Sequence, residues 1–396
     1  MINKKKSIVI TSAVRTAIGT YNGSLKDIQG HDLGSVVVKE VIEKSKLKSN
    51  DIDELIMGQV LTGAVGQNPA RQAAIKAGIP AEKTAYVINQ VCGSGLRSVA
   101  AGYQAIISKD SKIIIAGGQE SMTNAPHAIH FRNEKKLDES KLIDTMIKDG
   151  LWDAFNGYHM GVTAENVADK WQITRKDQDN FAISSQRKAE KAQKEGKFNK
   201  EIVPIVLKSK KENNKFDIDE HPRSGMTLEK LSKLQPSFKS NGTVTPGNAS
   251  GINDGAAAVI LMNQEESEKR NLKPLAKIVS WATSGVDPSL MGSGPIPASR
   301  KALEKAQWKV SDLDLIESNE AFAAQSLAVI KDLGIPEEKT NVNGGAIALG
   351  HPIGASGTRI LVTLIHEMVR RNSKKGLATL CIGGGMGIAM CVERDF

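Results

Sequence analysis

The stretch NQVCGSGLRSVAAG, residues 89–102, joins a cysteine and two glycines to a run of helix-forming residues. Its SGLR at 94–97 recurs as SGTR at 356–359, and DIDELI at 51–56 resembles DLDLIE at 312–317. The spacing from the first aspartate of each acidic segment to the following serine is 43 residues in one half and 44 in the other. Chance matches would not preserve this spacing, so the chain contains two copies of one structural unit.

Each copy alternates β-type apolar runs with helical segments. The first copy contains SIVITSA, a helix from about Asp32 to Lys46, ELIMGQV, a helix entered at Cys92, and SKIIIAGG. The second contains AKIVSWATSG, a helix over about 298–307, LDLIESN, a helix entered near Ser356, and LATLCIGGGMGIAMCVE. This alternation with short connectors predicts an α/β fold in which helices cover the faces of a sheet.

The segment between the copies differs in composition. Residues 122–246 are rich in Lys, Asn, Asp and Glu, have few apolar runs, and include RKDQDNFAISSQRKAEKAQKEG, which predicts an amphipathic helix. We expect an inserted, loop-rich lobe at 122–246, an N-terminal half at 1–121 completed by 247–273, and a C-terminal half at 274–396. The charge of the insertion indicates a solvated surface, with a subset of phosphate-contacting residues as the alternative.

Composition narrows the possible partners. A net charge of +9 and a pI near 9.2 indicate an anionic partner. Aromatic residues make up only 4% and are not interleaved with basic stretches, which argues against nucleic acid. The uncharged stretch 376–392 contains five glycines, which argues against a membrane helix. Cysteines at 92, 381 and 391 form no CxxC motif, so we expect a soluble protein of the reducing cytoplasm.

Cys92 stands at the start of the helix predicted by SGLRSVAAG. Free N–H groups and the macrodipole at a helix N-terminus favour negative charge, so we expect a lowered pKa for this thiol. The Gly-Ser-Gly that follows lets a substrate approach the backbone and exposes N–H groups to a developing oxyanion. The alternative is a small apolar side chain in the core.

His351 lies in NGGAIALGHPIGASG, residues 343–357, on a tight and uncharged loop. This loop leads into the second-copy equivalent of the Cys92 helix, so the repeat predicts that His351 lies near Cys92. A thiol beside a basic imidazole is typical of an activated nucleophile, whereas a lone histidine is more often structural.

Further candidate residues lie near helix and strand ends or form a pair of histidines. Cys381 ends a strand, and its expected counterpart in the first copy is Ala116 or a neighbour, whereas Cys391 belongs to an apolar strand and to the core. Asn319 and Glu320 begin a predicted helix, where capping accounts for one of them. A histidine pair at 127 and 130 lacks a third ligand at metal-binding spacing, so no metal site is expected.

Five motifs, in this order and along nearly the whole chain, resemble the thiolase family: VCGSG, GNASGINDGAAA, NEAFA, GHPIGASG and CIGGGMG. The chain is most similar to the biosynthetic acetyl-CoA C-acetyltransferase, or acetoacetyl-CoA thiolase, branch. The resemblance implies a five-layered αβαβα fold built from two βαβαβαββ halves with a loop lobe inserted in the first. It also implies a CoA thioester substrate, whose phosphates suit a basic protein.

The implied reaction is the reversible condensation of two acetyl-CoA to acetoacetyl-CoA and CoA through an S-acetyl-cysteine. By resemblance, Cys92 is the nucleophile, His351 its base, and Cys381 the acid/base for the substrate carbon. Asn319 holds a water that stabilises the enolate together with His351, and the N–H groups of Cys92 and Gly383 bind the tetrahedral oxyanion. Two thiols with separate roles match this chemistry. One thiol binds the acyl group covalently, and the other removes a proton from the methyl carbon of the second substrate.

The resemblance also assigns residues to the CoA and acyl groups. They are Ser250, Leu151, His159, Met160, Arg223, Phe238, Ala321 and Phe322. Arg223 is expected nearest the adenine nucleotide, and bulky His159, Met160 and Phe238 are expected to limit the acyl pocket to short chains. Lys230 stands where this branch usually has a small polar residue, which leaves the local adenosine contacts open.

Three alternatives remain beside the acetyltransferase. A degradative 3-ketoacyl-CoA thiolase of broader chain length shares every implied catalytic residue. A ketoacyl-synthase-like condensing enzyme would not use a thiol at 381, and an acyl-CoA-binding scaffold would lack a catalytic residue. The resemblance further implies fatty acid metabolism, CoA as substrate rather than cofactor, and a homodimer or homotetramer, the latter through a loop like NAPHAIHFRN at 124–133.

Overall fold

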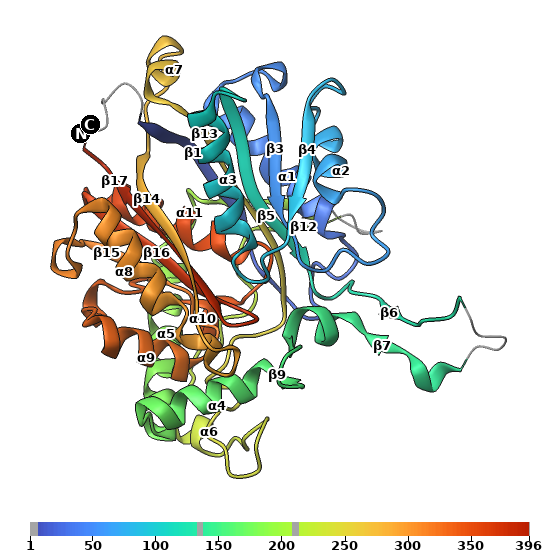
Figure 1. Cartoon of the computed structure of the whole chain (residues 1–396), viewed down its shortest axis with the longest axis vertical. Coiled ribbons are helices and arrows are strands. Elements are labelled where there is room, and N and C mark those ends of the chain that lie inside the picture. The colour runs from blue at the N-terminus through green and yellow to red at the C-terminus, as the bar shows by residue number, and fades with distance from the viewer. Residues whose placement is uncertain (1–6, 133–137, 208–213, 396) are drawn as a thin grey trace.

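The centre of the molecule is a long mixed sheet (Figure 1). The computed structural model describes residues 7–132, 138–207 and 214–395. Hydrogen-bonded neighbours follow the order β15-β16-β17-β14-β1-β13-β5-β3-β4. The strands of the first half are β1 (Ile8–Thr16), β3 (Glu54–Gly58), β4 (Thr84–Ile88), β5 (Ile113–Ser121) and β13 (Asn253–Asn263). Those of the second are β14 (Ala276–Gly285), β15 (Leu315–Ser318), β16 (Lys375–Ile382) and β17 (Met386–Glu393).

The two halves of the sheet meet along β1 and β14. Only two residue pairs join them, Val9 with Lys277 and Ile10 with Ala276. In the first half β3 runs parallel to both β4 and β5. In the second half β15 runs parallel to β16, and a single parallel bridge between Ile316 and Thr340 takes the place of β4.

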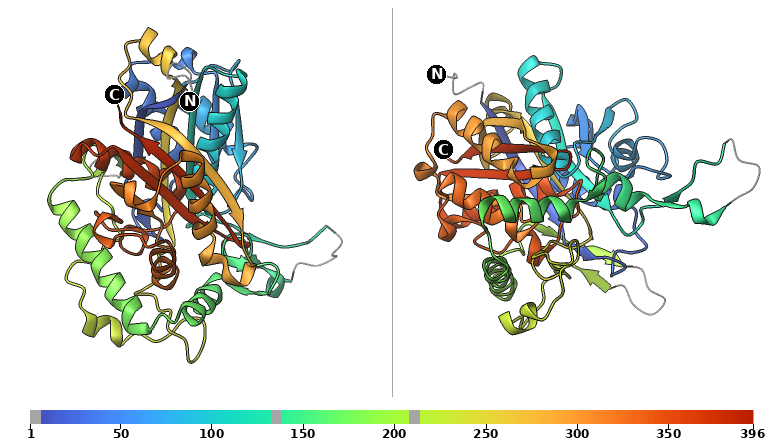
Figure 2. Two further views of the ribbon diagram at one scale, coloured as in Figure 1. Left: turned by 60° about the vertical axis from the view of Figure 1, so that its left-hand side comes forward. Right: turned by 60° about the horizontal axis from the view of Figure 1, so that its bottom comes forward.

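Helices fill a central layer and two outer layers. The first half contains α1 (Gly30–Ser45), α2 (Pro69–Lys76) and α3 (Ser94–Ser108), and the second α8 (Pro295–Ala306), α9 (Ala323–Leu333) and α11 (Ser356–Arg371). Helices α3 and α11 pack on each other and contact strands of both halves, whereas α1 and α8 cover the outer faces (Figure 2). The five-layered αβαβα fold from duplicated βαβαβαββ halves is therefore confirmed.

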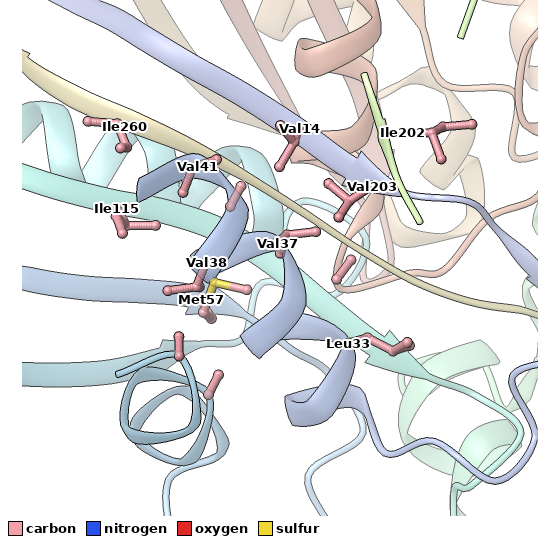
Figure 3. Packing of buried hydrophobic residues seen from close by; sticks show 14 of the residues in the cluster. Val14, Leu33, Val37, Val38, Val41, Met57, Ile115, Ile202, Val203 and Ile260 are labelled. Carbon is pink, nitrogen blue, oxygen red and sulfur yellow. The ribbon is translucent and has the colours of Figure 1, made fainter. Parts of the chain in front are cut away.

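The sequence of each helix matches its layer. Leu33, Val37 and Val41 recur at helical spacing on α1 and pack on β-strand side chains such as Ile115 and Ile260 (Figure 3). Burial of each such side chain contributes about 1.5–3 kcal/mol. In contrast, α11 is buried along almost its whole length, as a helix between two sheets must be.

The register of the strands confirms the repeat and corrects one detail. Asp53 accepts the N–H groups of Lys112 and Ile113, and Asp314 likewise accepts those of Lys374 and Lys375. The same register makes Gln119, not Ala116, the counterpart of Cys381. The expectation was wrong because it aligned the paired glycines, which lie inside β5 in one copy and in the turn after β16 in the other.

The segment 122–246 contributes the lower part of the molecule and a projecting arm in Figure 1. It contains α4 (Met160–Trp171), α5 (Arg175–Lys194) and α6 (Leu228–Ser232). The helix expected from residue 175 is confirmed as α5, which begins with a capping box between Thr174 and Asp177. The arm is a hairpin of β6 (His127–Ala128) and β7 (Ile143–Asp144). It carries most of the loop expected at 124–133, of which residue 133 lies outside the described residues.

Candidate active site

The two central helices bring the two halves of the site together at their first turns. A Cβ on Gly95 would lie 2.8 Å from the backbone nitrogen of Thr358, so only glycine permits this approach. The Thr358 hydroxyl donates to the Gly95 carbonyl at 2.8 Å. The segments that precede these turns, which carry Cys92 and His351, therefore face one another as the repeat predicts.

Cys92 lies in a strained turn just before α3. The helix begins at Ser94, two residues after the expected entry, and the preceding Val91 has a φ of +45°. A left-handed conformation is costly for a β-branched residue, and such strain commonly marks functional turns. The Ser94 hydroxyl donates to the Val91 carbonyl at 2.6 Å and accepts the Gln90 N–H at 2.8 Å, which holds the turn in place.

The surroundings of the Cys92 thiol favour its neutral form. Burial raises its pKa to about 12, and the carboxylate of Glu120 acts in the same direction. The N–H groups of Gly383 and of Cys92 itself hydrogen-bond the sulfur and lower the pKa, but by less. The expected lowering by the helix N-terminus is therefore wrong, because desolvation of the thiolate outweighs the nearby N–H dipoles.

The turn between β16 and β17 supplies the Gly383 N–H. Three glycines, 383–385, connect Ile382 to its partner Met386 across the hairpin. Gly385 has a φ of +80°, and a Cβ there would lie 2.5 Å from the Val286 carbonyl oxygen. The hairpin can therefore form only with glycine at 385. Its Gly383 N–H and the N–H of Cys92, the two predicted oxyanion donors, both hydrogen-bond the Cys92 sulfur.

His351 is buried, and hydrogen bonds to two neighbours hold it. Its N–H donates to Asn253 at 2.9 Å, and its Nδ1 lies 2.6 Å from the Ser356 hydroxyl. Because that hydroxyl donates to the Pro352 carbonyl at 2.8 Å, we assign the imidazole proton to Nδ1 and the free lone pair to Nε2. Burial, with a smaller contribution from Arg359, lowers the His351 pKa to about 3, so the ring is a neutral base.

Asn319 lies beside this imidazole. Its Nδ2 is 3.4 Å from Nδ1 and 3.5 Å from Nε2 of His351. Its Oδ1 is buried and has no hydrogen-bond partner among the residues that the structure describes. Neither Asn319 nor Glu320 caps α9, which begins at Ala323, so Asn319 is free to hold a water or a substrate oxygen.

Cys381 is fully buried next to Cys92. Burial is the main cause of its raised pKa, and the proximity of Cys92 raises the pKa further. Its apolar neighbours include Met160, Ala321 and Phe322. Cys391, by contrast, lies in a separate apolar cluster on the outer side of the second half, as expected for a core residue.

One pocket of about 720 Å³, open to solvent, adjoins these groups. Of the predicted residues, its walls include Leu151, His159, Phe238, Ser250, Phe322 and His351. Met160 and Ala321 pack behind the wall, in the apolar cluster around Cys381. Arg223 does not line this pocket: its side chain is exposed and its N–H donates to Gln186. Exposed Lys230 donates to the Gly225 carbonyl at 3.1 Å.

Aromatic side chains close one end of the pocket. The rings of His159 and Phe238 are stacked with centroids 4.7 Å apart, and Phe238 meets Phe322 edge to face at 6.4 Å. Phe238 also presses on Gly161, where a Cβ would lie 2.2 Å from its ring. Phe238 and Phe322 also pack in the apolar cluster that contains Cys381.

Comparison with known proteins agrees with this geometry. Residues 8–265 match the family model for the thiolase N-terminal domain, and residues 272–394 match that for the thiolase C-terminal domain. The chain belongs to the thiolase family. An "Acetyl-CoA acetyltransferase" of Rhizobium meliloti (strain 1021) is 62% identical over 98% of this chain and 99% of the relative.

Solved thiolase structures superpose closely. The Bacillus anthracis acetyl-CoA acetyltransferase has a TM-score of 0.96 at 44% identity, with 99% of each chain covered. Human mitochondrial 3-ketoacyl-CoA thiolase has a TM-score of 0.95 at 42% identity, with 100% of each chain covered.

Two features of this thiolase's site were not foreseen from its sequence. Asn253, which orients the His351 backbone, stands in the quoted GINDG motif but was not singled out. The apolar floor of Met122, Ile147, Ile252 and Ile353 comes from distant segments that no local pattern connects.

The described ranges of the thiolase lack two further features. They contain no helix long and apolar enough to cross a membrane. They also contain no group of three or more His, Cys, Asp or Glu side chains arranged to hold a metal ion.

Proposed function

We propose that this thiolase is an acetyl-CoA acetyltransferase that interconverts two acetyl-CoA with acetoacetyl-CoA and CoA. The observation that carries the proposal is the convergence of Cys92, His351, Asn319 and Cys381 beside one short, aromatic-walled pocket. The 62% identity to a relative named acetyl-CoA acetyltransferase supports the same activity.

Cleavage of acetoacetyl-CoA begins at Cys92. His351 Nε2 takes the thiol proton as the sulfur attacks the keto carbon, and the N–H groups of Cys92 and Gly383 receive the resulting oxyanion. A neutral thiol and a neutral imidazole suit this step, since neither has to be held as an ion in a buried site. The donors are already in place, so they need no reorganisation during the reaction.

Collapse of this adduct breaks the carbon–carbon bond. The leaving acetyl-CoA enolate takes a proton from Cys381, while Asn319 and His351 stabilise its oxygen through a water. CoA then attacks the S-acetyl-cysteine, Cys92 regains a proton from His351, and the thiol proton of CoA restores Cys381. A thiol of raised pKa is neutral at rest and strongly basic once ionised, as reversible protonation of carbon requires.

The aromatic wall favours short acyl chains. Met160, Phe238 and Phe322 occupy the space into which a longer chain would extend. A 3-ketoacyl-CoA thiolase of broader chain length is the second candidate, supported by the close likeness to the human mitochondrial structure. Whether the enzyme accepts only short chains or also longer ones depends on whether the Phe238 ring can move out of this space.

The proposal extends to the setting of the enzyme. We place it in the cytoplasm, in fatty acid metabolism, as a homodimer or homotetramer that uses CoA as substrate and needs no cofactor or metal. The cytoplasm is proposed because its reducing conditions keep both active-site cysteines as free thiols. An oligomer is proposed because the projecting β6–β7 hairpin offers a surface for a second copy of the chain. Ser250 and Arg223 remain the proposed contacts of the CoA moiety.

The decisive test is thiolysis of acetoacetyl-CoA by free CoA, with the thioesters separated by chromatography. We expect rapid formation of acetyl-CoA, loss of activity in Cys92→Ala, and little cleavage of a long-chain 3-ketoacyl-CoA. Equal turnover of the long chain would establish the 3-ketoacyl-CoA thiolase instead. Absence of thiolysis of either substrate, with CoA still bound, would contradict both enzymes.

A further inference from the structure

Glu120, at the end of β5, is a buried carboxylate without a cationic partner. It is fully inaccessible to solvent, and no lysine, arginine or histidine within the described residues forms an ion pair with it. Its oxygens instead accept three backbone N–H groups, those of Val60 at 3.0 Å, Leu61 at 3.2 Å and Gly354 at 2.9 Å. An unpaired buried carboxylate is costly, so its retention requires a reason beyond packing.

These hydrogen bonds join two segments of the site. Gly354 lies three residues after His351, at the turn that leads into α11. Val60 and Leu61 follow β3, and with Ile353 they form the apolar cluster against which Cys92 packs. Glu120 thus links the backbone that carries the base to the residues that support the nucleophile.

The contact is close. A Cβ at position 354 would lie 2.6 Å from Glu120 Oε2, so the turn accepts this carboxylate only because residue 354 is glycine. The equivalent strand end in the second half is Ile382, and it presses on Gly93 in the same manner. The repeat therefore places an apolar group behind Cys92 and a charged group behind His351.

We propose that Glu120 is a positioning residue that fixes the His351 segment against the end of β3 and so sets where the imidazole stands relative to Cys92. This inference rests on the roles proposed above for Cys92 and His351. Its charge has a second effect: Glu120 accepts the N–H groups of Val60 and Leu61, whose side chains belong to the cluster on which Cys92 packs, and a carboxylate at this place disfavours the Cys92 thiolate.

The groups that face Glu120 define its titration. Asp254 on β13 is a second buried carboxylate, which accepts the N–H and hydroxyl of Thr123, and Cys92 lies on the side of α3. Burial and Asp254 raise the pKa of Glu120 to about 7 against the lowering by its three N–H donors. Above that pH the carboxylate is ionised and its effect on Cys92 is complete.

Two variants separate the effect of the charge of Glu120 from the effect of its side-chain length. Glu120→Asp keeps the charge but is one methylene too short to hold Gly354 and Val60 together. We expect kcat for thiolysis to fall by roughly 10- to 100-fold with KM for acetoacetyl-CoA little changed, because a misplaced base slows the chemical step. Glu120→Gln keeps the size but removes the charge, so Cys92 should be alkylated by iodoacetamide several-fold faster than in the wild type at pH 8 or above.

The matched control is Glu165→Gln. Glu165 is also buried and accepts the N–H groups of Thr243 and Val244, on a different segment of the pocket. Its loss should leave the pH dependence of Cys92 alkylation unchanged. Far-UV circular dichroism confirms that each variant is folded before it is compared.

The outcomes distinguish this proposal from the proposed function. A wild type that fails to cleave acetoacetyl-CoA refutes the function, and the alkylation of Cys92 still tests Glu120. An active wild type contradicts the role of Glu120 if folded Glu120→Asp keeps its kcat. It also does so if Glu120→Gln is alkylated with the pH profile of the wild type or of Glu165→Gln.

Discussion

Cys92 and His351 lie in surroundings that penalise charge on either group. Burial raises the thiol pKa to about 12 and lowers the imidazole pKa to about 3, so a resting thiolate–imidazolium pair does not form. The proton passes from Cys92 to His351 only as the sulfur attacks the carbonyl carbon of the substrate. Thiol-alkylating reagents, which react with the thiolate, should therefore modify Cys92 slowly.

The alkylation rate of Cys92 tests this resting state. Since the thiolate fraction below the pKa rises tenfold per pH unit, the iodoacetamide rate should climb about tenfold per unit above pH 8, where Glu120 is ionised. Mass spectrometry of the modified peptide gives the rate, with buried Cys391 as the internal control. A plateau below pH 8 would reveal an ion pair and contradict the neutral resting state.

Phe238 should decide chain length. Its ring stacks on His159 and fills the space beside Gly161, so Phe238→Ala opens the acyl end of the pocket. The ratio of kcat/KM for a six-carbon over a four-carbon 3-ketoacyl-CoA should rise by roughly tenfold or more. Ile107→Ala, at an exposed apolar side chain, is the control and should leave the ratio as in the wild type.

At the scale of elements, the β16–β17 hairpin connects strand geometry to catalysis. A methyl group at Gly385 collides with the Val286 carbonyl and forces a left-handed φ on a non-glycine residue. Gly385→Ala should therefore displace the Gly383 N–H from Cys92 and lower kcat by about 10²-fold, as the loss of an oxyanion donor does.

A control glycine separates strain from function. Gly334, at the end of α9, has a φ of +63° but open space around its Cβ position. Gly334→Ala should cost about 1–2 kcal/mol of unfolding free energy with kcat intact. An equal loss of kcat in both variants would show that the hairpin has no special role.

Element by element, prediction from sequence succeeded where a pattern was local. The α1 helix was expected from Asp32 to Lys46 and spans Gly30–Ser45, and β14 matches AKIVSWATSG. The short α2 and the half-exposed β4 were missed, because PARQAAIK spans only two turns and TAYVI lacks an alternating pattern.

Prediction of the site shows the same contrast between local sequence motifs and contacts that are distant in sequence. Cys92, His351, Asn319 and Cys381 stand in motifs, and the structure brings His351 beside Asn319 and Cys92 beside Cys381. The predicted direction of the Cys92 pKa shift was wrong. Desolvation comes from residues far along the chain, such as Met122 and Ile353, whose apolar side chains pack in the cluster that Cys92 contacts. No window of sequence records such a contact.

For the whole molecule, a buried ionic cluster joins the core to the segment between the two halves. Arg15 on β1 donates to Glu201 at 2.6 Å and to both oxygens of Asp219 at 2.7 and 2.9 Å, and none of these side chains is exposed. Together they hold Glu201 and Asp219 against β1, where β10 (Ile202–Val203) also pairs.

Removal of the central cation should be severe. Arg15→Leu leaves two buried carboxylates unpaired, so the unfolding free energy should fall by about 3–5 kcal/mol in a denaturant titration. Arg300→Leu breaks an exposed pair with Asp332 and should cost less than about 1 kcal/mol. Similar losses in the two variants would contradict a structural role for the buried cluster.

The unlike strand ends, Glu120 behind His351 and Ile382 behind Cys92, bear on how such an enzyme arises. In a symmetric pair of identical subunits both positions would carry the same residue, so one active centre could not have a charged side and an apolar side. Once a duplicated gene is fused, each copy mutates independently. The fusion is therefore what allows one half to specialise in presenting the nucleophile and the other in presenting the base.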